Sequence, residues 1–308
     1  AAGLAPIAHG SDGGGSIRIP SAVTGLVGIK PSRGRISNGP LRDAVGDIST
    51  NGPLARTVAD AAALLDAMAG PFPGDPVSAP PPALGTFLDA ASRDPGTLRI
   101  GYYLAPPLAH VDVHPDIAAA LDATVAALED LGHQVEEVAP PLDDALLPVF
   151  TTLWVSLALL TPIAADDEHR LRPLTRYLRE LGRGVSGNEL ASAVSILRLT
   201  SRAAMTATAH LDAVVVPTLA DLPAKVGQLH NDDDPAADFA AQVAYSPYCA
   251  GYNISGQPAI NVPMNWNSDG LPVGVQLVGR MHDEETIISL AAQLEATHDW
   301  RHRIPAMW

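Results

Sequence analysis

The residues best suited to chemistry lie in one short run near the start of the chain, Ser11 to Ser16, in which three glycines precede a serine. Without Cβ atoms, the backbone before Ser16 can approach a ligand closely and can adopt positive φ angles. Acyl transfer needs a hydroxyl nucleophile and N–H donors that meet the oxyanion formed when a carbonyl is attacked. We therefore predict Ser16 as the nucleophile. The amides of Gly13, Gly14, Gly15 and of Ser16 itself are the candidate oxyanion hole; the alternative is a glycine-rich turn with an incidental serine.

Other glycine motifs do not fit this run. It contains neither a P-loop pattern nor G-x-G-x-x-G, so a phosphate cradle is not indicated. The G-x-S-x-G elbow also fails, because Arg18 occupies the position of its second glycine.

Four neighbouring side chains are candidates to support Ser16. Arg18 is expected to form a structural ion pair with Asp12, with a contact to a substrate carboxylate as the alternative. Ser11 is grouped with them as a supporting residue. His9 is a candidate general base, but it has no acidic residue beside it, so a structural role is preferred.

The sequence resembles the amidase signature family in five ordered blocks. They are residues 11–34 (with SDGGGSIRIPS and GLVGIKPSRG), 52–60 (GPLARTVAD), 212–218 (DAVVVPT), 253–263 (NISGQPAINVP) and 271–279 (LPVGVQLVG). The resemblance implies a serine amidase with a Ser–cis-Ser–Lys triad, in which Ser16 is the nucleophile and Lys30 occupies a non-catalytic position. The family's bridging serine and lysine would precede Ala1, so we expect activity to require an upstream segment.

The resemblance also implies the fold and the function. We expect one amidase-like α/β domain over residues 1–308, with a mixed, largely parallel sheet covered by helices on both faces. A variable helical segment at about 142–210 is expected to shape the substrate pocket. The expected reaction is hydrolysis of a small linear or cyclic carboxamide; residues 10–34 and 254–258 also look similar to the family's hydrolases of cyclic amino-acid oligomers. An amidotransferase subunit and a catalytically incompetent scaffold are the alternatives.

Composition limits the partners. The net charge of −15 argues against direct nucleic-acid binding, which needs a basic face. Cys249 is the only cysteine, which excludes an internal disulfide, and a buried structural role is preferred to a reactive thiol. With no convincing signal peptide, we expect a cytoplasmic protein, and a homodimer is compatible with the sequence.

Two segments invite other interpretations. Residues 146–165 carry no formal charge, but prolines and acidic flanks favour a buried helix or a pocket wall over a membrane span. Residues 231–234 (NDDD) lack the glycine and the terminal glutamate of a calcium loop, so a solvated turn is expected. Neither a metal nor a cofactor is predicted.

Local patterns predict several elements. Helices are expected from Thr57 as N-cap to Gly70, over 116–131 and over 283–294. Strands are expected at 98–102 and 133–138, and a hairpin joins 259–262 to 273–278. The proline-rich stretch 71–82 should be an extended connection.

Overall fold

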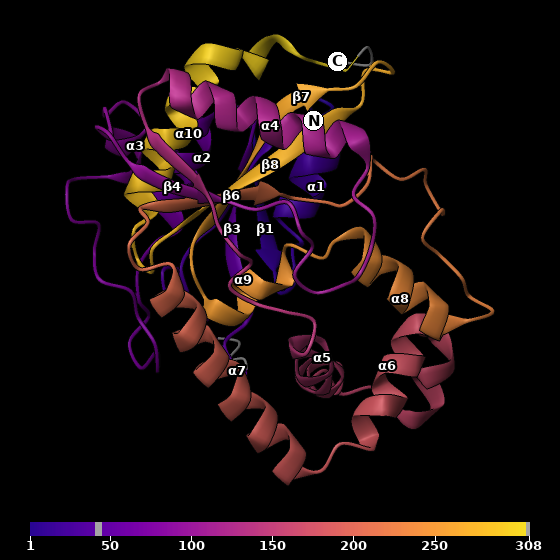
Figure 1. Ribbon diagram of the computed structural model, residues 1–308. Helices are drawn as coiled ribbons and strands as arrows, with labels where there is room; N and C mark the ends of the chain where they lie inside the picture. The colour runs from indigo at the N-terminus through magenta and orange to yellow at the C-terminus, as the bar shows by residue number, and fades with distance from the viewer. Residues whose placement is uncertain (41–44, 306–308) are drawn as a thin grey trace.

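The computed structural model describes residues 1–40 and 45–305, and within them the strands form one eight-stranded sheet. In sheet order these are β1 (Ile7–Asp12), β3 (Thr50–Ala55), β2 (Val27–Lys30), β7 (Ala259–Trp266), β8 (Pro272–Gly279), β6 (Ala213–Pro217), β4 (Arg99–Tyr102) and β5 (Gln134–Glu137). The strands nearest the N-terminus thus pair, through β2 and β7, with those nearest the C-terminus (Figure 1).

The α/β class and the mixed sheet are confirmed, but the pairing is less parallel than expected. Parallel pairs join β4 to β5 and β4 to β6, whereas the other neighbours run antiparallel. Parallel pairing occurs where a crossover joins the strands, as the connection through α4 (Pro115–Asp130) joins β4 to β5. It does not extend to β7 and β8, because the short connection through Asn267 and Gly270 joins them as the predicted hairpin.

Four helices cover one face of the sheet. They are α2 (Val58–Met68), α3 (Phe87–Ala90), α4 (Pro115–Asp130) and α10 (Glu284–His298). Val215 of β6 faces this layer, while its neighbours Val214 and Val216 face the opposite layer, as the period of two in a strand requires. Every residue of β6 is therefore buried, which explains its uninterrupted apolar sequence.

The opposite face carries the short helices α1 (Arg18–Thr24) and α9 (Ala250–Ser255). Beyond them lies a group of helices that Figure 1 shows below the sheet: α5 (Leu146–Leu157), α6 (Pro173–Arg183), α7 (Gly187–Ala207) and α8 (Pro235–Tyr245). Two 3₁₀ helices complete the described chain, η1 (Ala165–Arg170) and η2 (Trp300–His302). The helical character of residues 142–210 is confirmed.

The first part of the uncharged stretch, residues 146–157, forms the expected helix, whereas residues 158–165 lie beyond it and include the exposed Leu160. Helix α5 ends at Leu157, and Leu146, Phe150 and Leu153 are buried in a cluster with α7 and α9 residues. No helix within residues 1–40 and 45–305 has both the length and the apolar character that crossing a bilayer would require.

The predicted helix start at Thr57 is also confirmed, since the Thr57 hydroxyl accepts a hydrogen bond from the amide of Asp60 at 3.0 Å. The predicted helices at 116–131 and 283–294 are α4 and α10, and the strands at 98–102 and 133–138 are β4 and β5. Residues 71–82 contain neither helix nor strand.

Candidate active site

Ser16 lies in the tight connection between β1 and α1. Strand β1 ends at Asp12, α1 begins at Arg18, and the glycines make the turn between them. Ser16 is exposed and lines a hollow of about 140 Å³. The other lining residues are Gly14, Ile19, Leu108, Leu147, Phe150, Trp154, Phe239, Gln242, Val243, Ser246, Pro247 and Ala250. The nucleophile predicted from sequence is therefore open to a small hollow whose walls are mostly apolar.

Asp12 holds this connection in shape. Its Oδ1 accepts a hydrogen bond from the amide of Gly15 at 2.7 Å, and its Oδ2 accepts one from the amide of Ile17 at 3.1 Å. The chain on both sides of Ser16 is thus tied to one fully buried carboxylate. Because its neighbours are fixed in this way, Ser16 is held at the mouth of the hollow.

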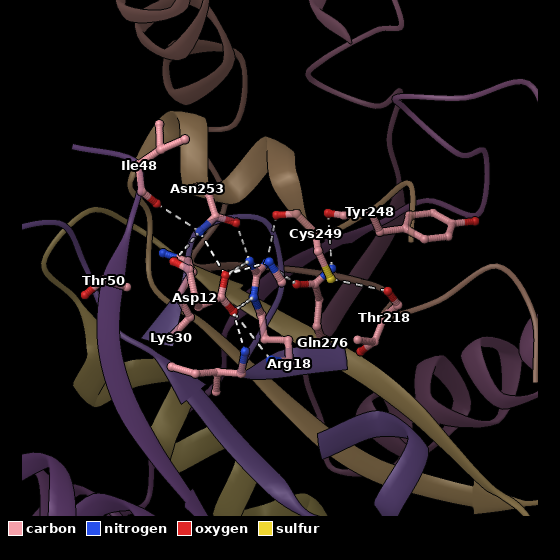
Figure 2. A network of polar contacts seen from close by, with 12 residues as sticks. Asp12, Arg18, Lys30, Ile48, Thr50, Thr218, Tyr248, Cys249, Asn253 and Gln276 are labelled. Atoms are coloured by element: carbon pink, nitrogen blue, oxygen red, sulfur yellow. Dashed lines mark hydrogen bonds and ion pairs between the residues drawn. The ribbon is translucent and has the colours of Figure 1, made fainter. Parts of the chain in front are cut away.

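Arg18 pairs with Asp12 and connects the loop to the rest of the fold (Figure 2). Its Nε and Nη2 donate to the two carboxylate oxygens at 3.0 and 2.9 Å. The guanidinium also donates to the Cys249 carbonyl at 2.9 Å, to Gln276 Oε1 at 3.0 Å and to Asn253 Oδ1 at 2.6 Å. The predicted ion pair is confirmed. The alternative contact with a substrate carboxylate is wrong, because Arg18 is fully buried and these bonds occupy its guanidinium.

The ionisation of the pair follows from this geometry. Burial alone would raise the pKa of Asp12, but the charge and hydrogen bonds of Arg18, with help from Lys30 and Asn253, lower it to about 2. Burial likewise opposes the charge on Arg18, yet the charge of Asp12 raises the pKa of the guanidinium. Both groups are therefore charged at neutral pH, so a full ion pair lies beneath residues 13–17, which we call the nucleophile loop.

The predicted oxyanion hole needs one correction. The Gly15 amide is directed at Asp12 Oδ1 and is not available to a ligand. Within the described residues, the amides of Gly13, Gly14 and Ser16 make no hydrogen bond to another protein group. A Cβ on Gly13 would lie 2.8 Å from Ser49 Oγ and 3.3 Å from the Trp154 ring, so a larger residue there would have to displace these side chains. The amides of Gly13, Gly14 and Ser16 therefore stay the candidate donors, and Gly14 and Ser16 are the two of these residues that line the hollow.

The structure does not bring Ser11 and His9 into the site. Both are exposed on β1, where Ser11 lies opposite Asn51 and His9 opposite Pro53 of β3. Neither lines the hollow at Ser16. The structure therefore gives no support to Ser11 as a supporting residue or to His9 as a general base.

Lys30 and Cys249 lie close to the Asp12–Arg18 pair, but neither lines the hollow. Lys30 is 1% exposed, and burial together with the charge of Arg18 lowers its pKa to about 7. Burial raises the pKa of the Cys249 thiol to about 11, so this sulfur is a poor nucleophile. The buried position predicted for Cys249 is confirmed.

Two residues of the site, Asn253 and Gln276, were not predicted from the sequence. Asn253 donates to the backbone oxygens of Asp12 and Ile48, at 2.9 and 3.0 Å, and so joins α9 to the nucleophile loop. Gln276 of β8 accepts from Arg18. Both lie in blocks that carry the family resemblance, which is the one signal that could have pointed to them.

Metal ligation finds no support in the part of the chain that the structure describes, where no group of three or more His, Cys, Asp or Glu residues is placed to hold an ion. The residues at 231–234 serve the fold instead. Asp234 caps α8 by accepting from the amide of Ala237 at 3.1 Å, and the amide of Asn231 donates to Asp238.

Comparison with known proteins decides the family, since the amidase family model matches residues 1–288. The chain belongs to the amidase family. It is 35% identical over its whole length to 6-aminohexanoate-cyclic-dimer hydrolase of Paenarthrobacter ureafaciens and 40% identical to a putative amidase of Mycobacterium bovis. It spans 66% and 63% of these two relatives.

Solved structures agree with this membership. The structure of 6-aminohexanoate cyclic dimer hydrolase complexed with substrate matches with a TM-score of 0.90 and 33% identity. The match covers 99% of this chain and 67% of that enzyme. The amidase fold is therefore present over nearly the whole chain.

Proposed function

We propose that this amidase-family chain carries the nucleophile and substrate pocket of an enzyme that hydrolyses small carboxamides through an acyl-enzyme on Ser16. The observation that supports this proposal is the exposed Ser16 in a largely apolar hollow, beside backbone amides that have no hydrogen-bond partner among residues 1–40 and 45–305. Family membership supports the same chemistry, because the relatives above are named as hydrolases and amidases.

The reaction starts when Ser16 Oγ attacks the amide carbonyl carbon and loses its proton to a base. The carbonyl oxygen becomes negatively charged and accepts hydrogen bonds from the amides of Gly13, Gly14 or Ser16. When the C–N bond breaks, the nitrogen takes a proton and leaves as an amine. Water then attacks the ester on Ser16, which releases a carboxylic acid and restores the hydroxyl.

The base is the component that the hollow itself does not provide. Among the described residues that line it, none has an acidic or basic side chain. A free serine hydroxyl is a weak nucleophile at neutral pH, so a proton acceptor is needed for useful rates. We propose that the family's lysine and bridging serine fill this role from a segment upstream of Ala1.

Covalent labelling tests the nucleophile. A fluorophosphonate forms a stable adduct only with an activated serine, and mass spectrometry of peptides locates it. We expect the adduct on Ser16 and its loss in Ser16→Ala. Ser49→Ala is the matched control, because Ser49 lies against Gly13 but outside the hollow. The Ser49→Ala protein should still be labelled on Ser16. Absence of any adduct in a protein that includes the upstream segment would favour the scaffold alternative.

A second comparison tests the missing base. Residues 1–308 alone and the same chain extended by the upstream coding sequence should differ in amide turnover by at least about 10². Amidase-like turnover by residues 1–308 alone would refute the upstream base. If hydrolysis were confined to glutamine and depended on a partner, the amidotransferase alternative would replace the proposal.

A further inference from the structure

The hollow at Ser16 has one polar wall in otherwise apolar surroundings. Gln242 near the end of α8 and Ser246 just after it form this wall, and both also line an adjoining hollow of about 370 Å³. On the α5 side, Phe150 and Trp154 stack with ring centroids 5.5 Å apart. A molecule bound at Ser16 therefore meets aromatic rings from α5 and polar groups from α8.

The orientation of the Gln242 amide is fixed from behind by Asp238. Gln242 Nε2 donates to Asp238 Oδ1 at 2.6 Å, one turn earlier on the same helix. A carboxylate only accepts hydrogen bonds, so the nitrogen of Gln242 and not its oxygen must face it. Asp238 is itself held, since it is 1% exposed and its Oδ2 accepts from the amide of Asn231 at 3.1 Å.

This arrangement leaves Gln242 Oε1 as an acceptor. Within the described residues the oxygen has no hydrogen-bond partner, and it is not among their buried unsatisfied atoms. Because the side chain lines both hollows, this oxygen is open to a bound molecule.

Ser246 also offers a hydrogen-bond acceptor to the hollow. Its Oγ donates its single hydrogen to the backbone oxygen of Gln242 at 2.9 Å, which leaves only lone pairs for a ligand. The two side chains thus present acceptors, whereas the nucleophile loop presents N–H donors from Gly13, Gly14 and Ser16. These two kinds of groups complement the two ends of an amide, C=O and N–H.

We infer that Gln242 Oε1 and Ser246 Oγ accept the N–H of the substrate's amide group. This inference rests on the proposed function and narrows its substrates to primary and secondary carboxamides. An ester or a tertiary amide has no N–H to donate. When such a molecule binds, Gln242 Oε1 and Ser246 Oγ lose the water that hydrogen-bonds to them and gain no donor in its place. A carboxylate would face these two acceptors with no cationic side chain among the described residues that line the hollow at Ser16.

Binding to the Ser16→Ala protein tests the inference without requiring turnover. Calorimetric titration would compare N-ethylbenzamide with ethyl benzoate and with N-ethyl-N-methylbenzamide, which share the aromatic acyl group. We expect the secondary amide to bind about three- to tenfold more tightly than the other two. Gln242→Met, which keeps the length but removes the oxygen, should reduce this preference to less than twofold.

Asp238→Asn is the sharper variant. The new amide can keep the bond from Asn231 while its nitrogen faces Gln242, so that Gln242 turns its own nitrogen toward the hollow. The preference for the secondary amide should then disappear although Gln242 is intact. Circular dichroism would confirm that both variants are folded.

Phe239→Leu is the matched control on the same helix, because Phe239 lines the hollow without a polar group. Phe239→Leu should lower the affinity for all three ligands by a similar factor and leave the order of their affinities unchanged. Equal affinity of the starting protein for the three ligands, or no measurable binding of the amide, would overturn the inference. A Gln242→Met effect equal on all three would do the same, whereas failure of Ser16 labelling alone would overturn only the acyl-enzyme mechanism.

Discussion

Asp12→Asn should be among the most damaging single substitutions in the protein. Asp12 accepts hydrogen bonds from three backbone amides, from Arg18 Nε and Nη2, and from Asn253 Nδ2. Asparagine removes the charge that faces Arg18 and points an N–H₂ group at some of these donors. Because Arg18 is fully buried, its guanidinium would then lack a counter-charge in the protein interior.

The expected loss can be estimated from that burial. Removing one partner of a buried ion pair costs about 3–5 kcal/mol, against a total of about 5–15 kcal/mol for a typical domain. Urea denaturation followed by circular dichroism would measure it. Replacing both partners with apolar residues, Asp12→Leu with Arg18→Met, should recover part of the loss, and the double-mutant cycle gives the coupling.

The pH dependence provides an independent check. The pKa of Asp12 is lowered from 3.8 to about 2, so its contribution is complete above pH 3.8 and is lost as the pH falls through 2. The difference between the original protein and Asp12→Asn should shrink over that range. Asp167→Asn, which breaks the exposed pair with Arg170, should change little. A loss below about 1 kcal/mol for Asp12→Asn would refute the reasoning.

Three further predictions concern buried groups and close packing. The pKa of Lys30 is lowered from 10.5 to about 7, so above pH 7 the unfolded chain binds more protons than the folded protein. The free energy of unfolding should therefore rise by up to about 3 kcal/mol between pH 7 and 9. Urea denaturation midpoints of Lys30→Met should lack this rise. A Cβ on Gly52 would collide with the Ile29 carbonyl, so Gly52→Ala should destabilise the fold by about 1–3 kcal/mol in thermal denaturation, whereas Gly187→Ala, with open space around it, should not. Cys249, buried with a pKa of about 11, should react with Ellman's reagent only after unfolding; rapid reaction of the native protein would contradict its burial.

Local chemistry explains why much of the fold could be predicted from the sequence. The Thr57 cap and the apolar spacing of α2 and α4 act within one helix, so their residues are neighbours in the chain. The hairpin of β7 and β8 also depends on nearby residues. The order of the sheet does not, because β2 pairs with β7 from the far end of the chain.

In the candidate site, too, contacts between residues close in sequence could be predicted, whereas contacts between distant segments could not. Asp12 and Arg18 lie within a few residues of each other, so residue types and spacing were sufficient to predict their ion pair, whereas the role of Ser16 as nucleophile stays a prediction. Asn253 and Gln276 reach Arg18 only through the folded sheet. The Gly15 amide was misassigned because sequence alone does not show which way an N–H points, and here Asp12 captures it.

A crystal structure of the phosphonylated protein would show whether backbone amides of the nucleophile loop receive negative charge next to Ser16. The phosphorus should be bonded to Ser16 Oγ, with its phosphoryl oxygen about 2.7–3.1 Å from the amide nitrogen of Gly13 or Gly14. A phosphoryl oxygen directed to solvent, with those amides facing elsewhere, would contradict the account.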